Sequence, residues 1–209
     1  MKRKFLFVFI TLNTFVLGAQ NISTLFVEMP RDILFILTDN NRKDMVDLYV
    51  NEKEASVLNI MGGDSKLIQL NENYIKLQLT TQNTVEIKLL PLVNKTQIIC
   101  VVQTACAPVC DSRISFYTTK WEPIENNGLV KPFTVQNFLN NSELETEKRQ
   151  NALASLDTQF FQYQLNPDNN DLSVFYTTPE YLGIEEQKEV EPYLTHKPLV
   201  LHWNNTRFQ

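Results

Sequence analysis

Residues 85–117 carry the strongest strand pattern in the chain, together with all three of its cysteines. Three runs rich in β-branched and aromatic residues occupy residues 85–93, 97–104 and 112–118. Two short turn-forming segments separate these runs, at residues 94–96 and 106–110. Connections this short join antiparallel strands, so the stretch predicts a meander.

The middle run is apolar at every position from 98 to 102. A strand that does not alternate with polar residues belongs in the interior of a sheet that is covered on both faces, at least locally. Because 209 residues of ordinary globular composition can bury a sizeable core, we expect one α+β domain. Its sheet is predicted to be curved and mainly antiparallel, with helices packed on one face.

Residues 1–19 have the pattern of a secretory signal peptide. A cationic start, Lys2-Arg3-Lys4, precedes an apolar run that ends in small residues at Ala19. Cleavage after Ala19 leaves residues 20–209 as a single domain, with one candidate sub-boundary at the polar connection 124–132. An uncleaved membrane anchor is the alternative interpretation of the first 19 residues.

The mature protein is expected in the periplasm, in the cell envelope or outside the cell. No cysteine precedes Cys100, so we do not expect a lipoprotein. No apolar run after residue 20 reaches the roughly 20 residues of a membrane helix, so no stable membrane span is expected after cleavage. Removing the three leader charges changes the net charge from −5 to −8. An acidic chain argues against a nucleic-acid partner.

Helices are predicted before and after the sheet-forming stretch. Pro30 fits the first position of a short helix over residues 30–37, and residues 39–53 predict a second, amphipathic helix. The charged residues of the second helix are expected to face solvent, and these are Arg42, Lys43, Asp44, Asp47, Glu52 and Lys53. Later elements are predicted as a helix at 143–156, strands at 158–165 and 172–177, a helix after Thr178 and a strand at 199–203.

The cysteine pairing is predicted from the strand register. If Thr104 faces Ser112 across the hairpin, then Cys106 faces Cys110, which favours a Cys106–Cys110 disulfide in an oxidising compartment. Cys100 is then a buried free thiol. A redox-active pair is the alternative, but three residues rather than two separate the cysteines, and no helix follows them.

No residue is predicted to be catalytic, to bind a cofactor or to hold a metal ion. His196 and His202 are separate in the chain, and the five glycines form no phosphate-binding loop. Aromatic residues on the later strands, such as Phe175 and Tyr176, are interpreted as core, with a sugar-stacking surface as the alternative.

A candidate binding surface consists of Asp111, Arg113, Tyr117 and Trp121. Asp111 and Arg113 bring a carboxylate and a guanidinium together at the start of a predicted strand. The simplest interpretation of this pair is an aspartate that closes the turn and an arginine held in an ion pair.

Three segments carry a resemblance to a known family: residues 38–47 (TDNNRKDMVD), Met61-Gly62-Gly63 with Tyr74, and most specifically residues 106–113 (CAPVCDSR). On these residues the chain resembles a family of exported Bacteroidales proteins of unknown function, over essentially the whole mature chain. The resemblance implies a bacterial envelope or secreted protein. It implies no activity, cofactor or catalytic residue.

We therefore expect a non-enzymatic binding or accessory protein that engages a glycan, a peptide or a protein partner. The alternative is a secreted hydrolase of glycans or peptides, which uses carboxylates that the fold brings together. The two functions differ in whether acidic side chains converge in a pocket.

Overall fold

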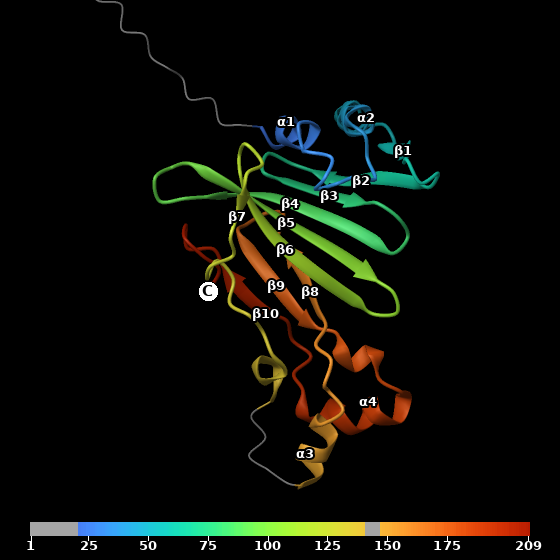
Figure 1. The fold of residues 1–209 in the computed structure, drawn as a ribbon, viewed down its shortest axis with the longest axis vertical. Helices are drawn as coiled ribbons and strands as arrows, with labels where there is room; N and C mark the ends of the chain where they lie inside the picture. The colour runs from blue at the N-terminus through green and yellow to red at the C-terminus, as the bar shows by residue number, and fades with distance from the viewer. Residues whose placement is uncertain (1–20, 141–146) are drawn as a thin grey trace, which may run out of the picture.

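The computed structural model describes residues 21–140 and 147–209. The predicted signal peptide and residues 143–146 of a predicted helix lie outside the described residues. Seven strands form one antiparallel sheet in chain order (Figure 1): β1 (Ser56–Leu58), β2 (Asp64–Leu70), β3 (Tyr74–Gln78), β4 (Asn83–Pro91), β5 (Gln97–Cys106), β6 (Cys110–Thr118) and β7 (Pro123–Ile124). The antiparallel order follows from the short connections, which leave no room for a crossover.

The predicted meander and its register are confirmed. Thr104 lies opposite Ser112, and Cys106 lies opposite Cys110, at the closed end of the β5–β6 hairpin. The apolar run of β5 is buried on both faces, with Val101 in one core and Val102 in another. The sheet is therefore covered on both sides at its centre, as the lack of alternation predicts.

Two helices cover one face of this sheet. The first, α1 (Ile22–Val27), is capped by the Asn21 side chain, and the second, α2 (Asp39–Val50), begins with a capping box. Their apolar side chains pack with the odd-numbered residues of β4 and β5 to form the helix-side core, which includes Leu25, Phe26, Met45, Ile87 and Ile99. The predicted packing of helices on this face is confirmed, although α1 itself is absent from the sequence-based prediction.

Two local predictions in this region are wrong. Residues 30–37 form a series of turns rather than a helix, and Arg42 is buried instead of solvent-exposed. Both differences have one cause, because the Arg42 guanidinium donates hydrogen bonds to the backbone carbonyls of Val27, Met29 and Leu37. These carbonyls accept hydrogen bonds from a side chain and not from backbone N–H groups of a helix. The segment therefore wraps around the guanidinium.

A second sheet covers the opposite face (Figure 1), with the order β10-β9-β8. Its strands are β8 (Phe161–Leu165), β9 (Asp171–Tyr176) and β10 (Leu199–His202), and all are antiparallel. Apolar residues of the two sheets meet in the sheet-side core, which includes Cys100, Val102, Phe116, Leu172 and Val174. Residues 124–132, the candidate sub-boundary, place Val130 in this same core.

The outer edge of β8 is held by side chains of the large sheet. The backbone N–H of Phe161 donates to Asp111 Oδ1 at 3.1 Å, and the N–H of Tyr163 donates to Ser112 Oγ at 3.0 Å. These bonds satisfy donors that an edge strand otherwise leaves exposed for pairing with another chain. They also tie the edge strand of the small sheet to the start of β6.

The remaining elements extend from the far end of the small sheet (Figure 1). They form a third small core, in which Ala152, Leu156, Val190 and Leu194 are buried. Every helix in the two described ranges is too short or too polar to span a lipid bilayer. The elements are η1 (Val135–Phe138), α3 (Glu147–Leu153), η2 (Thr178–Tyr181), α4 (Ile184–Val190) and η3 (Glu191–Tyr193).

Candidate functional site

A cavity of about 440 Å³ opens on the helix side of the large sheet, where β4 begins, β5 ends and β6 begins. These three positions meet because neighbouring strands of a meander run in opposite directions. We call this space the strand-end cavity. Most of its wall is apolar, and the aliphatic side chains come from Ile33, Leu34, Ile36, Leu79, Val85 and Ala105.

The turn segment 30–37 forms the outer wall of the cavity, and two hydrogen bonds hold it in place. Gln103, on β5, donates from Nε2 to the carbonyl of Ile33 at 3.1 Å. The backbone N–H of Ile60 donates to the carbonyl of Ile36 at 3.2 Å. The wall is therefore attached both to the sheet and to the β1–β2 hairpin.

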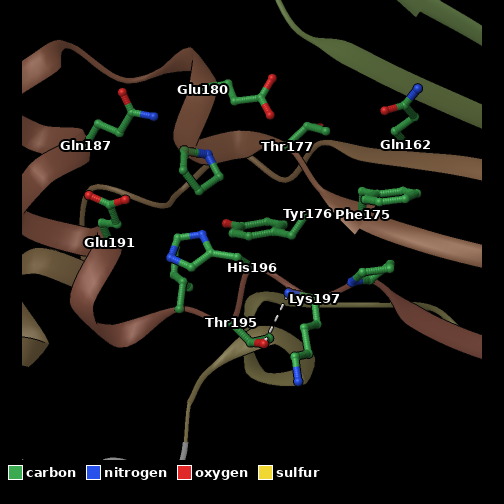
Figure 2. A pocket seen from close by; sticks show the side chains of 13 residues that line it. Gln162, Phe175, Tyr176, Thr177, Glu180, Gln187, Glu191, Thr195, His196 and Lys197 are labelled. Atoms are coloured by element: carbon green, nitrogen blue, oxygen red, sulfur yellow. Dashed lines mark hydrogen bonds between the residues drawn. The ribbon is translucent and has the colours of Figure 1, made fainter.

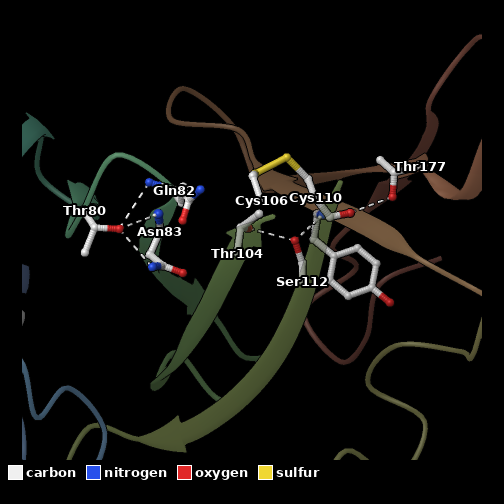
Figure 3. Close-up of a disulfide and its surroundings, with 9 residues drawn as sticks. Thr80, Gln82, Asn83, Thr104, Cys106, Cys110, Ser112 and Thr177 are labelled. Carbon is white, nitrogen blue, oxygen red and sulfur yellow. Dashed lines mark hydrogen bonds between the residues drawn. A yellow bond between two sulfur atoms is a disulfide. The ribbon is translucent and has the colours of Figure 1, made fainter. Parts of the chain in front are cut away.

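Figure 3 shows the disulfide next to Thr104 and Ser112, two polar residues of the cavity lining. Cys106 and Cys110 are bonded, so the predicted pairing is confirmed, and Cys100 is a buried free thiol. Next to the bridge, the hydroxyls of Thr104 and Ser112 share a hydrogen bond of 2.8 Å across the strands. The hairpin end that supports the cavity is thus closed by a covalent bond and a side-chain hydrogen bond.

Asp111 and Arg113 both line the strand-end cavity. Asp111 is held by the bond that it accepts from the Phe161 N–H, so its role is a tertiary contact rather than a turn closure. Arg113 is exposed, and no carboxylate in residues 21–140 and 147–209 lies within ion-pair distance of it. The expected ion pair of Arg113 is therefore absent from this part of the chain, and its guanidinium faces the cavity rim unneutralised.

The other two residues of the predicted binding surface lie elsewhere. Trp121 is 7% exposed and donates from Nε1 to the carbonyl of Leu25 at 3.0 Å. The ring of Tyr117 packs 5.6 Å from the Trp121 ring. The structure brings Asp111 and Arg113 together and separates them from this aromatic pair, which anchors α1 to the sheet.

An apolar surface adjoins the strand-end cavity. Phe35, which lines the cavity, is 61% exposed, and Met61, at the tip of the β1–β2 hairpin, is 71% exposed. Ile60 and Leu58 of the same hairpin are also exposed, and Ile60 contacts the cavity wall through the bond to Ile36. These residues lie on the two segments that the Ile60–Ile36 bond joins beside the cavity, and exposed apolar residues that cluster mark interaction surfaces more often than isolated ones do.

A second cavity, of about 240 Å³, lies at the far end of the small sheet, and we call it the C-terminal pocket (Figure 2). Its lining combines the half-buried Tyr176 ring with polar side chains from β8, η2, α4, η3 and the loop at 195–198. Burial raises the pKa of the Tyr176 hydroxyl. The polar side chains of this lining include Gln162, Glu180, Gln187, Glu191, His196 and Lys197.

Two acidic side chains, Glu180 and Glu191, line this pocket, and Figure 2 shows them on different sides of the Tyr176 ring. His196 is in the same lining, whereas His202 lies on β10 with its Nδ1 2.6 Å from Asp171 Oδ1. In the described ranges, no three histidine, cysteine, aspartate or glutamate side chains lie together as metal ligands do.

Sequence patterns missed most of both cavities. The sequence pattern predicts a helix where the wall at 33–36 is formed by turns, and the C-terminal pocket draws on short 3₁₀ turns and a loop at 195–198 that carry no periodic signal. The signals that were available are the exposed, non-alternating hydrophobic residues Leu58, Ile60 and Met61 around a Gly-Gly turn.

Comparison with known proteins places the chain in a family without assigning an activity. A solved structure, described as a domain of an uncharacterized protein from Porphyromonas gingivalis W83, is similar to it with a TM-score of 0.81 and 31% sequence identity. The similarity covers 91% of this chain and 99% of that one. No curated protein matches the sequence. The family "Protein of unknown function (DUF3256)" matches residues 14–208. The chain therefore belongs to this family of unknown function.

Proposed function

We propose that this is an exported, non-enzymatic binding protein that holds an apolar side chain of a partner polypeptide in the strand-end cavity. Arg113 pairs with an acidic group on the same segment of the partner. The observation that carries the proposal is the aliphatic cavity of about 440 Å³ with an unneutralised guanidinium at its rim. Apolar pockets with a few placed polar groups are the usual form of a binding site.

The lining favours a polypeptide over a glycan. Ile33, Leu34 and Val85 offer methyl and methylene groups, which bury an aliphatic or aromatic side chain but leave sugar hydroxyls without partners. The apolar surface around Phe35 and Met61 extends the contact beyond the cavity, as a partner larger than a small molecule requires.

Two features support export, one in the sequence and one in the structure. Residues 1–19 have the order of charges and apolar residues found in secretory leaders. The Cys106–Cys110 disulfide is the kind of bond that persists outside the reducing cytosol. Mass spectrometry of the protein recovered from the periplasm of a Gram-negative host tests this step. A mature N-terminus at Gln20 supports export, and an intact Met1 in the inner membrane contradicts it.

Fluorescein-labelled hexapeptides test the binding site by fluorescence anisotropy. We expect peptides with leucine or phenylalanine next to aspartate to bind, and matched peptides with alanine or lysine at these positions to bind at least tenfold more weakly. Ala105→Trp fills the cavity from an exposed position on β5, and Arg113→Ala removes the charge. Each of these variants is expected to weaken binding.

The matched control variants are Ala154→Trp and Arg207→Ala, which change exposed residues outside the cavity lining. Both are expected to bind as the wild type does. Equal affinity for all peptides, or equal loss in the control variants, contradicts the proposal.

A hydrolase is the second candidate function, because Glu180 and Glu191 line one pocket together with His196. Glycosidases need only two carboxyl groups that face one cleft. Purified protein is incubated with polysaccharides and peptides, and products are detected by mass spectrometry. Cleavage that is lost in both Glu180→Gln and Glu191→Gln establishes this function, and cleavage that persists in either variant excludes the pair.

A further inference from the structure

The C-terminal pocket has walls that are fixed by the fold rather than by a ligand. Its segment 194–198 is anchored because Leu194 is buried and the N–H of Thr195 donates to the carbonyl of Phe138 at 2.8 Å. An isolated antiparallel bridge joins Leu139 to Leu194. Val190, at the end of α4, is also buried. The pocket is therefore preformed, which lowers the entropic cost of binding.

The floor of the pocket includes an aromatic ring of fixed orientation. The ring of Tyr176 stacks on Phe138, with centroids 5.5 Å apart and an angle of 20° between the planes. It also contacts the ring of Phe161 at 5.4 Å. Figure 2 shows the Tyr176 ring in the centre of the pocket, with Glu180, Glu191 and His196 around it.

The polar side chains of the rim are available to a ligand. In the described part of the chain, the side chains of six lining residues make no hydrogen bond or ion pair to another residue, and these are Gln162, Glu180, Gln187, Glu191, His196 and Lys197. The amides of Gln162 and Gln187 each supply donors and an acceptor, and the carboxylates of Glu180 and Glu191 accept. Lys197 adds a cationic donor to the lining.

This combination matches the chemistry of a pyranose ring. A pyranose has an apolar C–H face, which packs on an aromatic ring, and a rim of hydroxyls, each of which donates and accepts hydrogen bonds. A phosphorylated or carboxylated ligand suits the pocket less well, because two carboxylates face it against one lysine. An alkyl ligand leaves the two amides and two carboxylates without partners.

We propose that the C-terminal pocket binds a single uncharged sugar unit, either free or at the end of a glycan. This site is distinct from the strand-end cavity and does not depend on the function proposed for it. Tyr176 supplies the stacking surface, and Gln162, Gln187, Glu180 and Glu191 supply the hydroxyl contacts.

Saturation-transfer NMR tests the proposal on the full mature chain with the methyl glycosides of glucose, galactose, mannose and N-acetylglucosamine. We expect transfer to at least one sugar, strongest at the C–H groups that face Tyr176. We also expect amide shift changes around α4 and the 195–198 loop. Gln162→Ala and Gln187→Ala are each expected to weaken binding at least fivefold.

Gln164→Ala is the matched control, because Gln164 lies on the same strand, two residues from Gln162, and does not line the pocket. It is expected to bind as the wild type does. Absence of transfer to all four sugars overturns the proposal, and so does an equal loss in Gln164→Ala. The peptide assay at the strand-end cavity is independent, so failure of one site is distinguishable from failure of the other.

Discussion

The carboxylate of Glu86, on β4, accepts a hydrogen bond of 2.6 Å from the backbone N–H of Leu165, on β8. The other oxygen of the same carboxylate lies 2.9 Å from Lys76 Nζ. One buried side chain of the large sheet thus holds the edge strand of the small sheet and is itself neutralised by a cross-strand lysine. The two sheets are joined by oriented polar contacts as well as by apolar packing.

Glu86→Gln tests this junction. Both neighbours of the carboxylate are donors, so a glutamine accepts from only one of them, sets its own N–H₂ group against the other and removes the charge that pairs with Lys76. We expect the free energy of unfolding to fall by about 1–3 kcal/mol, measured by urea denaturation. Glu54→Gln, at the exposed Lys66 ion pair, is the control and is expected to change stability little. Equal effects at the two sites contradict the role of Glu86.

Lys88 predicts a specific pH dependence. Its Nζ is buried and donates to the carbonyls of Asn166 at 2.6 Å and Pro167 at 3.2 Å. Burial lowers the pKa of Lys88 from its ordinary value of 10.5, against the opposing effect of Asp168 and Asp171. Between the folded-state pKa and 10.5, the unfolded chain binds more protons at this group than the folded chain does. Its contribution to stability therefore rises with pH in that window.

Lys88→Met removes this contribution. We expect the difference in unfolding free energy between wild type and Lys88→Met to move in favour of the wild type as the pH rises from neutral toward about 10. Urea denaturation across this range measures the difference. Lys43→Met, at an exposed position on α2, serves as the control for loss of one positive charge. If the free energies of unfolding of wild type and Lys88→Met change in parallel with pH, the pKa of Lys88 is not lowered by burial.

Cys100 is predicted to be unreactive in the folded protein. Burial, and then the charge of Glu86, raises the pKa of its thiol, so little thiolate forms. We expect no alkylation by iodoacetamide at neutral pH in the folded state, one alkylated cysteine after unfolding without reductant, and three after reduction. Mass spectrometry measures the number of alkylated cysteines in each state. Three modified cysteines without reductant rule out the Cys106–Cys110 bridge.

The disulfide closes a loop of only a few residues, so its effect on stability is expected to be modest. The double variant Cys106→Ser with Cys110→Ser is expected to lose about 2 kcal/mol, because a short loop constrains the unfolded chain weakly. Urea denaturation of the variant against the oxidised wild type measures this loss. A loss several times larger indicates that the bridge also supports packing around Val109, which is buried in this loop.

The strands of the large sheet were predictable because their signals are local. Turn residues and β-branched runs locate β5 and β6 in the sequence, and the register assumed between them, with Thr104 opposite Ser112, is the one observed. The small sheet was predictable as a hairpin and a final strand, but its position was not, because the bonds from Phe161 and Leu165 to the large sheet link residues 50 and 79 positions apart.

The candidate site was predictable only in part, for the same reason. Asp111 and Arg113 are neighbours on one strand, so their type and spacing singled them out. The wall at Ile33 and Ile36 reaches them through contacts with Gln103 and Ile60, which no local pattern encodes. Trp121 was predicted for the binding surface, but it is buried and anchors α1. The sequence alone does not distinguish an exposed aromatic residue from a buried one.

Arg42 provides the sharpest test of how the helix-side layer is held. Its Nη1 donates to the carbonyl of Leu37 at 2.8 Å, and its Nη2 donates to the carbonyl of Met29 at 2.6 Å and to Asp39 Oδ1 at 2.8 Å. A lysine keeps the charge but presents its donors at one point, so it cannot reach these acceptors together. Arg42→Lys is expected to lower the free energy of unfolding by about 2–4 kcal/mol, measured by urea denaturation.

The control is Arg31→Lys, the same substitution at an exposed residue of the adjoining turn segment. It is expected to leave stability close to that of the wild type. Because the Arg42 bond to Leu37 fixes the end of the cavity wall, Arg42→Lys is also expected to weaken peptide binding under conditions in which it remains folded. Hydrogen exchange should show faster exchange over residues 22–37 in Arg42→Lys alone. Equal stability of the two variants means that the carbonyls around Arg42 are satisfied in another way and that the guanidinium does not hold this segment in place.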